Sequence, residues 1–283
     1  IESVWWLLGD IFKKDLLYKG YTIQPYSPAA GTGLSSHELN LPGCYKNVKD
    51  TTVVGQFKLK TEGVEKINQL INTQDSHGEM FFLAWTTTPW TLPSNTALAV
   101  GKNIEYVIVK SFNQYTGDPI TVLLAKNLLV KHFKAENATL SFDDYKLGDK
   151  KIPYEVIGEC KGSDLEGINY EQLLPFVLPY ETPEKAFRVI LGDFVTTEDG
   201  TGIVHIAPTF GADDAKVAKD AGVPPMLILN KEGNPVPLVD LQGRFVKEMG
   251  DQFGGKYVKN EYYKENAPDK SVDVELSIYL KEK

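Results

Sequence analysis

Cysteine, histidine and methionine are scarce in this chain of 283 residues, with 2, 4 and 3 copies. Two distant cysteines cannot build the disulfide framework of a small secreted domain, so we expect a reduced, cytoplasmic protein. The histidines form no HxxxH pattern and the cysteines no CxxC pattern. Zinc is therefore not expected, and the sequence indicates no other metal or cofactor.

Long apolar runs are missing as well, since none reaches the roughly 18 residues that a membrane-spanning helix needs. No partnership with a membrane is expected. The apolar opening at residues 4–12 differs from a signal peptide, because acidic Glu2 and Asp10 stand where a leader needs basic and apolar residues. The chain opens on this helix-like segment without an initiator methionine, so we expect a piece of a longer protein.

An excess of basic charge is also missing, because 30 Lys and Arg oppose 38 Asp and Glu, for a net charge of −8. Proteins that hold a nucleic-acid duplex through its phosphates need a basic face. Any nucleic acid bound here is therefore expected to enter as a short end, with most of its affinity supplied elsewhere.

Sequence signatures of covalent catalysis and of phosphate binding are absent too. The chain has neither a GxSxG nucleophile turn nor a GxxxxGK[ST] loop, and no cysteine in an activating context. Any hydrolysis by this chain would have to use a water molecule positioned by hydrogen bonds.

The sequence is dominated by short segments rich in β-branched residues, which Gly, Asn, Asp and Pro separate. Such segments indicate strands. Their number and spacing favour a β-rich mixed α/β fold, with a closed or nearly closed β-barrel core and a few flanking helices. Strands are expected at residues 21–26, 51–60, 79–88, 96–100, 105–112, 120–125, 154–159, 188–194 and 202–208. Helices are expected at residues 3–14, capped by Ser3, and at residues 126–133, 212–221 and 274–281.

The composition turns polar and charged after Pro235-Val236-Pro237. We therefore expect an inserted domain with two connecting arms. The outgoing arm would occupy residues 1–50, the barrel residues 51–237, and the returning arm residues 238–283.

A run of three threonines marks the first candidate site, a segment we call the threonine wall (residues 85–95). Threonine favours strands, so such a run alone is most often sheet surface. Here an apolar stretch precedes it, which indicates a buried strand that sends Thr86 and Thr88 to one face and Thr87 to the other. Two prolines stiffen the exit and hold Asn95 near the strand end. Such hydroxyl and amide groups suit recognition of a sugar hydroxyl or an ester carbonyl.

The second candidate site, the histidine–aspartate wall (residues 200–214), begins with Gly200 and Gly202, which permit a tight turn or close backbone approach. His205 follows on a short strand, where a lone histidine is usually a core or rim residue. Asp213 and Asp214 open a helix-like segment, and both can simply cap it. Alternatively Asp213 caps the helix and Asp214 is free to meet a cation, such as the α-ammonium of a ligand.

The two walls, WTTTPWTLPSN and GTGIVHIAPTFGADD, resemble the editing-site signatures of isoleucyl-tRNA synthetases, which are class I aminoacyl-tRNA synthetases. Supporting stretches lie at residues 21–27, 34–38 and 162–176, so the resemblance covers nearly the whole chain. Valyl and leucyl relatives typically read TTRP in the first segment, so Thr88-Pro89-Trp90 and His205 favour the isoleucyl branch. The HIGH-like and KMSKS-like motifs of the synthetic, ATP-binding site of the full-length protein are absent, so no amino-acid activation is expected.

The resemblance implies post-transfer editing, the hydrolysis of valine esterified to isoleucine tRNA. Isoleucyl synthetases are the standard example of the need for editing. The one methylene by which isoleucine exceeds valine separates the two amino acids by only roughly 1–3 kcal/mol, so a second, smaller sieve must remove the error. The implied partners are the aminoacylated 3′ end of isoleucine tRNA, its valine moiety, and the rest of the synthetase in cis.

The resemblance also implies roles for individual residues. Asp214 would bind the α-ammonium, and His205 would shape a sieve that admits valine rather than act as a base. A water oriented by threonine hydroxyls and by the neighbouring hydroxyl of the terminal adenosine would attack the ester without a metal. Catalytic roles are expected for Thr86, Thr88, Asn95 (near the ester) and Asp214, and substrate binding for Trp85, Thr87, His205 and Asp214.

Three alternatives remain at this stage. The site could prefer valyl-adenylate and edit before transfer, since both substrates share valine and adenosine. The chain could instead be a non-catalytic module that docks the tRNA acceptor end, which the intact polar residues argue against. A free-standing esterase or a general ligand binder is disfavoured by the missing nucleophile.

Overall fold

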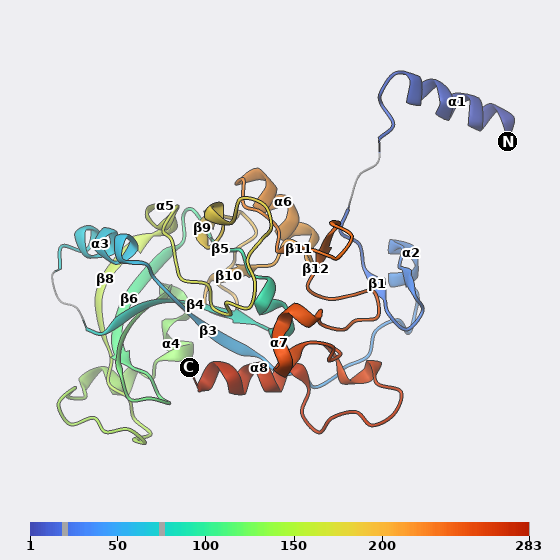
Figure 1. The fold of residues 1–283 in the computed structure, drawn as a ribbon. Helices are drawn as coiled ribbons and strands as arrows, with labels where there is room; N and C mark the ends of the chain where they lie inside the picture. Colours follow the sequence, from blue (N-terminus) through green and yellow to red (C-terminus); the bar gives the residue numbers. More distant parts are fainter. Residues whose placement is uncertain (19–21, 74–76, 283) are drawn as a thin grey trace.

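Two sheets form the body of the protein in the computed structural model, which describes residues 1–18, 22–73 and 77–282 (Figure 1). The larger has the strand order β3-β4-β7-β6-β8 and the smaller the order β10-β5-β9, while β1-β2 and β11-β12 form separate pairs. The strands are β1 (Tyr26–Ser27), β2 (Thr32–Gly33), β3 (Val53–Lys58), β4 (Glu79–Thr86), β5 (Ala97–Val100), β6 (Glu105–Phe112), β7 (Pro119–Ala125), β8 (Glu155–Lys161), β9 (Arg188–Leu191), β10 (Ile203–Ile206), β11 (Leu227–Leu229) and β12 (Pro235–Pro237).

Helices flank the sheets, and most are short. The α-helices are α1 (Glu2–Lys13), α2 (Ser36–Leu39), α3 (Thr61–Leu70), α4 (Leu129–His132), α5 (Gly162–Leu165), α6 (Ala212–Asp220), α7 (Gly250–Phe253) and α8 (Val272–Lys281). The 3₁₀ helices are η1 (Pro89–Ser94), η2 (Lys126–Leu128), η3 (Ala135–Thr139), η4 (Pro183–Lys185), η5 (Lys247–Met249) and η6 (Asn260–Tyr262).

Burial along β3 and β4 follows their places in the larger sheet. In β3, an edge strand, Gly55 and Phe57 are buried, while Val54 before them is exposed and Gln56 between them is only half-buried, as the alternating pattern predicts. β4 is paired on both edges, with antiparallel β3 and parallel β7, and its successive residues Phe82, Leu83 and Ala84 are all buried, so both of its faces are covered here. The apolar segment that precedes the threonines is therefore a core strand, and it carries Thr86 at its end.

The two sheets meet where the loop before β10 crosses the end of β7. The Ala125 amide at that end donates to the carbonyl oxygen of Thr201 over 2.8 Å. The Tyr106 hydroxyl, from β6, donates to the Gly202 carbonyl at 2.7 Å and accepts from the Gly101 amide at 3.0 Å. β10 also packs against β4. This junction brings the two candidate walls to one place.

The β-rich mixed α/β class is confirmed, but the barrel is not closed among the described strands. The smaller sheet is built from three strands of four residues each, which pair with one another and not with the ends of the larger sheet. The junction between the sheets is made by side chains, by the loop before β10 and by residues 167–171. In this second segment the Glu171 amide donates to the Lys58 carbonyl of β3, and the Gly167 amide donates to the Val189 carbonyl of β9. The expected strands from residue 51 onward are each found, with ends that differ by a few residues.

The N-terminal segments differ more from the sequence-based expectations. The expected strand at residues 21–26 is reduced to Tyr26–Ser27, because Pro25 lacks an amide hydrogen and a turn follows at once; Tyr21 lies outside the described residues. The first helix is present as α1, but its N-cap is Ile1 and no side chain caps it, so the cap expected from Ser3 is wrong.

One helix that the pattern missed, α3, covers an end of the larger sheet. Its sequence is polar with only scattered apolar residues, yet Gly63 and Ile67 are buried against the core. Gly63 lets the helix approach closely, since a Cβ there would lie 2.7 Å from the Ile168 side chain. The expected helices at residues 126–133, 212–221 and 274–281 are present as η2 with α4, as α6 and as α8.

The two ends of the chain pack differently. None of the α1 residues is buried, and the helix lies apart from the body in Figure 1. The segment after Pro237, in contrast, adds Leu238, Phe253 and Leu276 to the same core cluster as the sheet residue Phe82. The division at residues 50 and 237 into two arms and a barrel stays a prediction.

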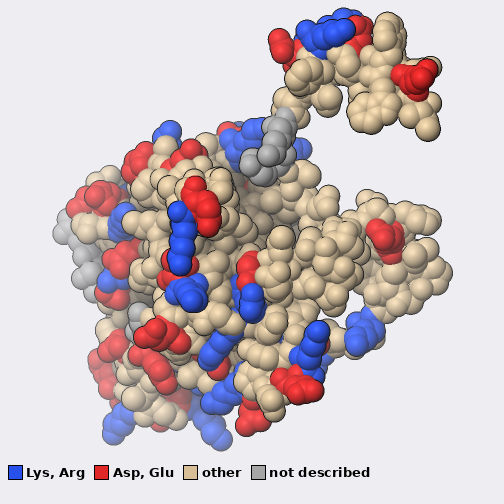
Figure 2. All heavy atoms as spheres, turned by 45° about the vertical axis from the view of Figure 1, so that its right-hand side comes forward, with Lys and Arg blue, Asp and Glu red and all other residues tan. Residues whose placement is uncertain are grey.

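The surface shows mixed charge. On the face drawn in Figure 2, Lys and Arg alternate with Asp and Glu, and no broad basic area lies there. Within the described part of the chain, every helix is too short or too polar to cross a bilayer.

Replacing Gly202 by alanine is expected to lower the free energy of unfolding by about 2–5 kcal/mol. Gly202 has a φ of +71°, and an added Cβ would clash with the Cβ of Ala125 at the junction of the sheets. Left-handed strain and overpacking add up to roughly that loss. Urea unfolding measures it.

Gly222→Ala is the matched control, because Gly222 has a φ of +68° but open space around its Cβ position. It should lose only the strain, about 1–2 kcal/mol. Equal losses in the two variants would show that close approach at Gly202 does not hold the sheets together.

Candidate functional site

A cavity of about 390 Å³ opens at the junction of the two sheets. One side is the end of β4, and the other is the segment that enters β10. A third side, the loop after β9, was not expected from the sequence. The lining residues are Trp85, Thr86, Thr87, Phe194, Thr196, Glu198, Asp199, Gly200, Thr201, Gly202, Ile203, Val204 and His205.

The threonine wall divides its side chains as the alternation predicts. Thr86 is buried and Thr87 is exposed. The Thr88 amide donates to the Thr86 hydroxyl oxygen at 3.1 Å, and the two hydroxyl oxygens are 3.4 Å apart. β4 ends at Thr86, and this local hydrogen bond keeps Thr88 on the same side. The result is a pair of adjacent hydroxyls at a strand end.

The turn after the threonines carries a residue to which the sequence assigned no role, Thr91. Pro89 starts η1, whose compact turn brings the Thr91 hydroxyl within 2.8 Å of the Thr88 carbonyl, to which it can donate. The Thr91 hydroxyl oxygen is also 3.3 Å from that of Thr88 and 3.0 Å from Nε2 of His205. Thr91 therefore connects the threonine wall to the histidine.

His205 lies on β10 and faces inward. Its ring is almost fully buried, and burial lowers the pKa of the imidazole to about 4, so the ring is neutral near pH 7. Nε2 meets Thr91, while Nδ1 is buried without a hydrogen-bond partner among the described residues. A neutral, buried ring at a cavity wall suits a steric role better than proton transfer at neutral pH.

Asn95 is placed behind the wall. Its Nδ2 donates to the Ala97 carbonyl at 2.8 Å, and its Oδ1 accepts from the Tyr170 hydroxyl at 2.6 Å. Both contacts are buried, and Asn95 does not line the cavity. In this geometry the amide fixes the start of β5 instead of facing a ligand.

The two aspartates of α6 behave differently from one another. The helix has Gly211 as its N-cap with no side-chain cap bond, so the alternative in which Asp213 caps the helix is not realised. Asp214 Oδ2 accepts from the Ala207 amide at 2.8 Å, across the turn that leaves β10. Burial raises the pKa of Asp214, the Ala207 amide opposes this, and Asp213 adds a smaller raising effect. Its Oδ1 has no hydrogen bond within the described part of the chain.

The structure thus joins some of the predicted residues and separates others. Trp85, Thr86, Thr87 and His205 line one cavity, and Thr88 reaches it through Thr91. Asn95 and Asp214 are not among the residues that line it. The close approach expected of the glycines is present, since a Cβ on Gly200 would lie 2.9 Å from the Trp85 ring. Within the described residues, no three His, Cys, Asp or Glu side chains are grouped to hold a metal ion.

The residues missed by sequence reasoning have weak local signals. Thr91 lies within the first motif, and the proline before it indicates a turn that would fold it back. The loop at residues 193–199 reads only as a polar connection. Its place on the cavity depends on contacts with distant segments.

Buried His205 should make stability fall in mild acid. The unfolded chain binds a proton at this histidine with a pKa of about 6.5, whereas the folded chain does so at about 4. Roughly 3 kcal/mol of the free energy of unfolding is therefore expected to be lost as the pH falls from 6.5 to 4. Urea unfolding across this range measures the slope.

The His205→Gln variant should lack this part of the slope, and His37→Gln, at an exposed histidine, should keep it. If the slope of unfolding free energy against pH is the same in His205→Gln, protonation of the buried ring does not destabilise the folded chain.

Comparison with known proteins gives consistent matches over the whole chain, although no protein-family model matches it. The isoleucine–tRNA ligase of Bacteroides fragilis is 58% identical, over 99% of this chain and 25% of that protein. That of Cytophaga hutchinsonii is 58% identical, over 100% of this chain and 25% of that protein. The chain therefore spans about a quarter of the length of these curated relatives. Among solved structures, the P. knowlesi cytosolic leucyl-tRNA synthetase editing domain has a TM-score of 0.44 and 15% identity, over 60% of this chain and 62% of that one.

Proposed function

The chain belongs to the isoleucine–tRNA ligase family as the segment that bears the editing signatures, and on that premise we propose that it hydrolyses valine from misacylated isoleucine tRNA. The observation that carries the proposal is the contact between the two walls. Thr88, Thr91 and His205 form one hydrogen-bonded series beside the cavity. A threonine-rich, hydroxyl-bearing wall is thereby held against a rigid, neutral aromatic ring.

Selection of valine is assigned to the His205 side of the cavity. The ring is buried and hydrogen-bonded at Nε2, so it cannot move aside at low cost. An isoleucyl side chain carries one methylene more than a valyl side chain. Forcing that methylene into a packed wall costs roughly 1–3 kcal/mol, which is the size of effect that a second sieve needs.

Hydrolysis is assigned to a water molecule held by the wall. The paired hydroxyls of Thr86 and Thr88 offer both donors and acceptors at the cavity edge. Together with the vicinal hydroxyl of the terminal adenosine, they orient the water for attack at the ester carbonyl. The water adds to the carbonyl carbon, the ribose oxygen leaves with a proton, and free valine and intact tRNA result.

Two further residues receive supporting roles. Asp214 offers its free oxygen Oδ1 to the α-ammonium of the amino acid, while Ala207 holds the other oxygen. Asn95, whose amide hydrogen bonds stay inside the protein, positions the strand behind the wall. The aminoacylated 3′ end of the tRNA and the remainder of the synthetase in cis are the proposed partners.

Deacylation by the 283-residue chain tests the proposal. Isoleucine tRNA carrying valine or isoleucine is incubated with the chain, and release of the amino acid is followed. We expect valine to be released at least about 10-fold faster, as one methylene predicts.

Binding of the tRNA end without release of either amino acid would favour the docking module. Release from valyl-adenylate but not from valyl-tRNA would favour editing before transfer. Equal release of both amino acids would remove the sieve from the proposal.

A further inference from the structure

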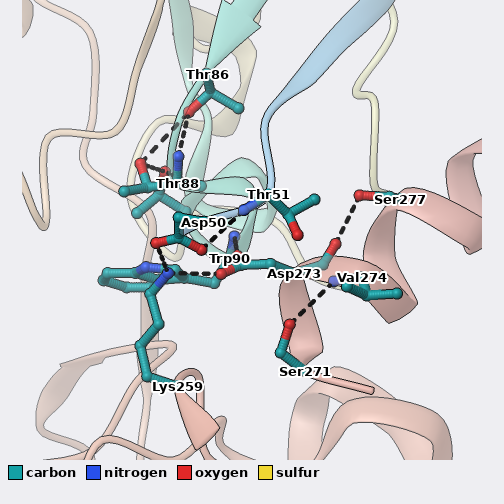
Figure 3. A network of polar contacts seen from close by, with 11 residues as sticks. Asp50, Thr51, Thr86, Thr88, Trp90, Lys259, Ser271, Asp273, Val274 and Ser277 are labelled. Atoms are coloured by element: carbon teal, nitrogen blue, oxygen red, sulfur yellow. Dashed lines mark hydrogen bonds and ion pairs between the residues drawn. The ribbon is translucent and has the colours of Figure 1, made fainter. Parts of the chain in front are cut away.

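Away from the cavity, a small ion network ties the segments before and after the sheets to the threonine wall (Figure 3). Lys259 Nζ lies 2.6 Å from Asp50 Oδ2 and 2.7 Å from Asp273 Oδ2. Asp50 immediately precedes the run into β3, and Asp273 lies in the first turn of α8. Asp50 lies 209 positions from Lys259 in the sequence, and Asp273 lies 14 positions from it. One ammonium group thus joins segments from the two ends of the chain.

The network ends on the backbone of the turn that follows the threonines. Asp273 Oδ1 accepts a hydrogen bond from the Trp90 amide at 2.8 Å, from 183 positions away in the chain. Trp90 is in the first turn of η1, where the amide groups have no partner within the helix. Asp273 therefore acts as a cap supplied from another element. Without it this amide would be left unpaired on a half-buried turn.

The same short turn holds the contacts that build the cavity wall. Trp90 stands between Thr88 and Thr91, and the Thr91 hydroxyl meets Nε2 of His205 at 3.0 Å. A shift of the Trp90 backbone would move the neighbouring threonine and thereby the hydroxyl series. The path from Asp273 to His205 runs through one hydrogen bond, two residues of backbone and one side-chain contact.

Asp273 is built to stay in place. Its side chain is 1% exposed. Within α8, the Ser277 hydroxyl donates to the backbone carbonyl of Asp273 at 2.6 Å. Burial raises the pKa of the carboxyl, and the ammonium of Lys259 and the Trp90 amide act against this. A buried carboxylate costs free energy unless it is paired, so Lys259 favours the charged form of Asp273 and orients it. Asp50 helps to hold Lys259 in place, although its own negative charge raises the pKa of Asp273.

We propose that Asp273 is a positioning residue for editing, and that the Asp50–Lys259–Asp273 network makes the geometry of the threonine wall depend on how the flanking segments are seated. The proposal rests on the proposed function of the cavity. Where the synthetase moves these segments, the Trp90 turn and the threonine hydroxyls move with them.

Two readouts on the 283-residue chain test the proposal. The first is hydrogen exchange of the Trp90 amide in protein labelled with ¹⁵N-tryptophan, which is simple to assign because the chain has 4 tryptophans. The second is kcat and KM for release of valine from valyl-tRNA. A hydrogen bond to a charged acceptor predicts that Asp273→Ala speeds Trp90 exchange about 10- to 100-fold and lowers kcat by a similar factor. KM should change less than about twofold, because the substrate contacts remain.

Two other variants keep the test decisive if Asp273→Ala folds poorly. Asp273→Asn retains an acceptor oxygen for Trp90, and should recover most of the kcat. Asp50→Asn changes an aspartate that is 41% exposed, and should leave the fold intact. Because Asp50 is a partly exposed member of the network, we expect its loss to speed Trp90 exchange by only about 2- to 5-fold.

Glu275→Gln is the matched control. Glu275 lies on the same helix, α8, and pairs with Lys256 at 2.7 Å, and within the described part of the chain its carboxylate makes no hydrogen bond to η1. The variant should leave both readouts unchanged. The proposal is overturned if Trp90 exchange is the same in Asp273→Ala as in the unaltered chain, or if Glu275→Gln lowers kcat as much. A chain that releases no valine would defeat the proposed function, while Trp90 exchange would still decide the positioning role.

Discussion

Asp214→Ala is expected to lower kcat/KM for release of valine by about 100-fold, because removing one partner of a desolvated charge pair costs on the order of 3 kcal/mol. Asp214 lies partly buried at the start of α6, with one oxygen held by the Ala207 amide. Its other oxygen is the anchor proposed for the α-ammonium. Steady-state deacylation of valyl-tRNA by the variant and the unaltered chain measures the loss.

The neighbouring Asp213 supplies the control, since it is exposed and carries the same charge. Asp213→Ala should leave kcat/KM within about twofold, as exposed charges contribute little. Equal losses in the two variants would mean that α6 contributes general negative charge and not a specific anchor.

The pH dependence of kcat/KM gives a second check on Asp214. Burial raises its pKa, so the carboxylate form that binds an ammonium is lost at a higher pH than for an exposed aspartate. Activity should therefore fall as the pH drops through this raised pKa. Asp213 also raises the pKa, so Asp213→Asn should shift the acid limb to lower pH. A shift in the opposite direction would contradict the assignment.

His205→Ala is expected to raise the rate of isoleucine release by about 10- to 100-fold while changing valine release much less, because the variant removes the wall that the extra methylene meets. His205 is buried beside the cavity and held by Thr91, so the space that opens is fixed in position. Parallel deacylation of isoleucyl- and valyl-tRNA measures the ratio of the two rates.

His205→Phe separates bulk from hydrogen bonding. Phenylalanine keeps an aromatic ring in the wall but loses the Nε2 contact with Thr91. Discrimination should be retained in His205→Phe and lost in His205→Ala. If isoleucyl-tRNA stays intact with His205→Ala, the sieve lies elsewhere in the cavity, and the loop at residues 193–199 becomes the first place to search.

Much of the fold was predictable because local patterns decide it. The strand at residues 105–112 matches β6, since it holds a run of β-branched residues, Val107 to Val109, and turn residues flank it. The division of Thr86 and Thr87 between two faces follows from the period of a strand. The close backbone approach at Gly200 and Gly202 was predictable because glycine has no Cβ, which leaves room for a neighbouring segment.

The features that the sequence did not reveal depend on distant partners. α3 has a polar sequence and is fixed by burial of Gly63 and Ile67 against other elements. The Tyr170 hydroxyl donates to the side-chain oxygen of Asn95, a residue that was expected to form a hydrogen bond near the ester. No pattern near Trp90 indicates that Asp273 caps it. Full closure of the barrel core is not found among the described strands for a similar reason, because strand number does not decide which strands pair.

The central strand of the smaller sheet has a consequence for synthesis on the ribosome. β5, with the sequence Ala-Leu-Ala-Val, is fully buried, and both of its neighbours, β9 and β10, lie roughly 90 to 110 positions later in the chain. A nascent chain therefore carries an uncharged strand with two unpaired edges until those segments emerge. Such edges invite pairing with other chains. Shielding β5 during this interval becomes a requirement of making the protein, separate from its stability once folded.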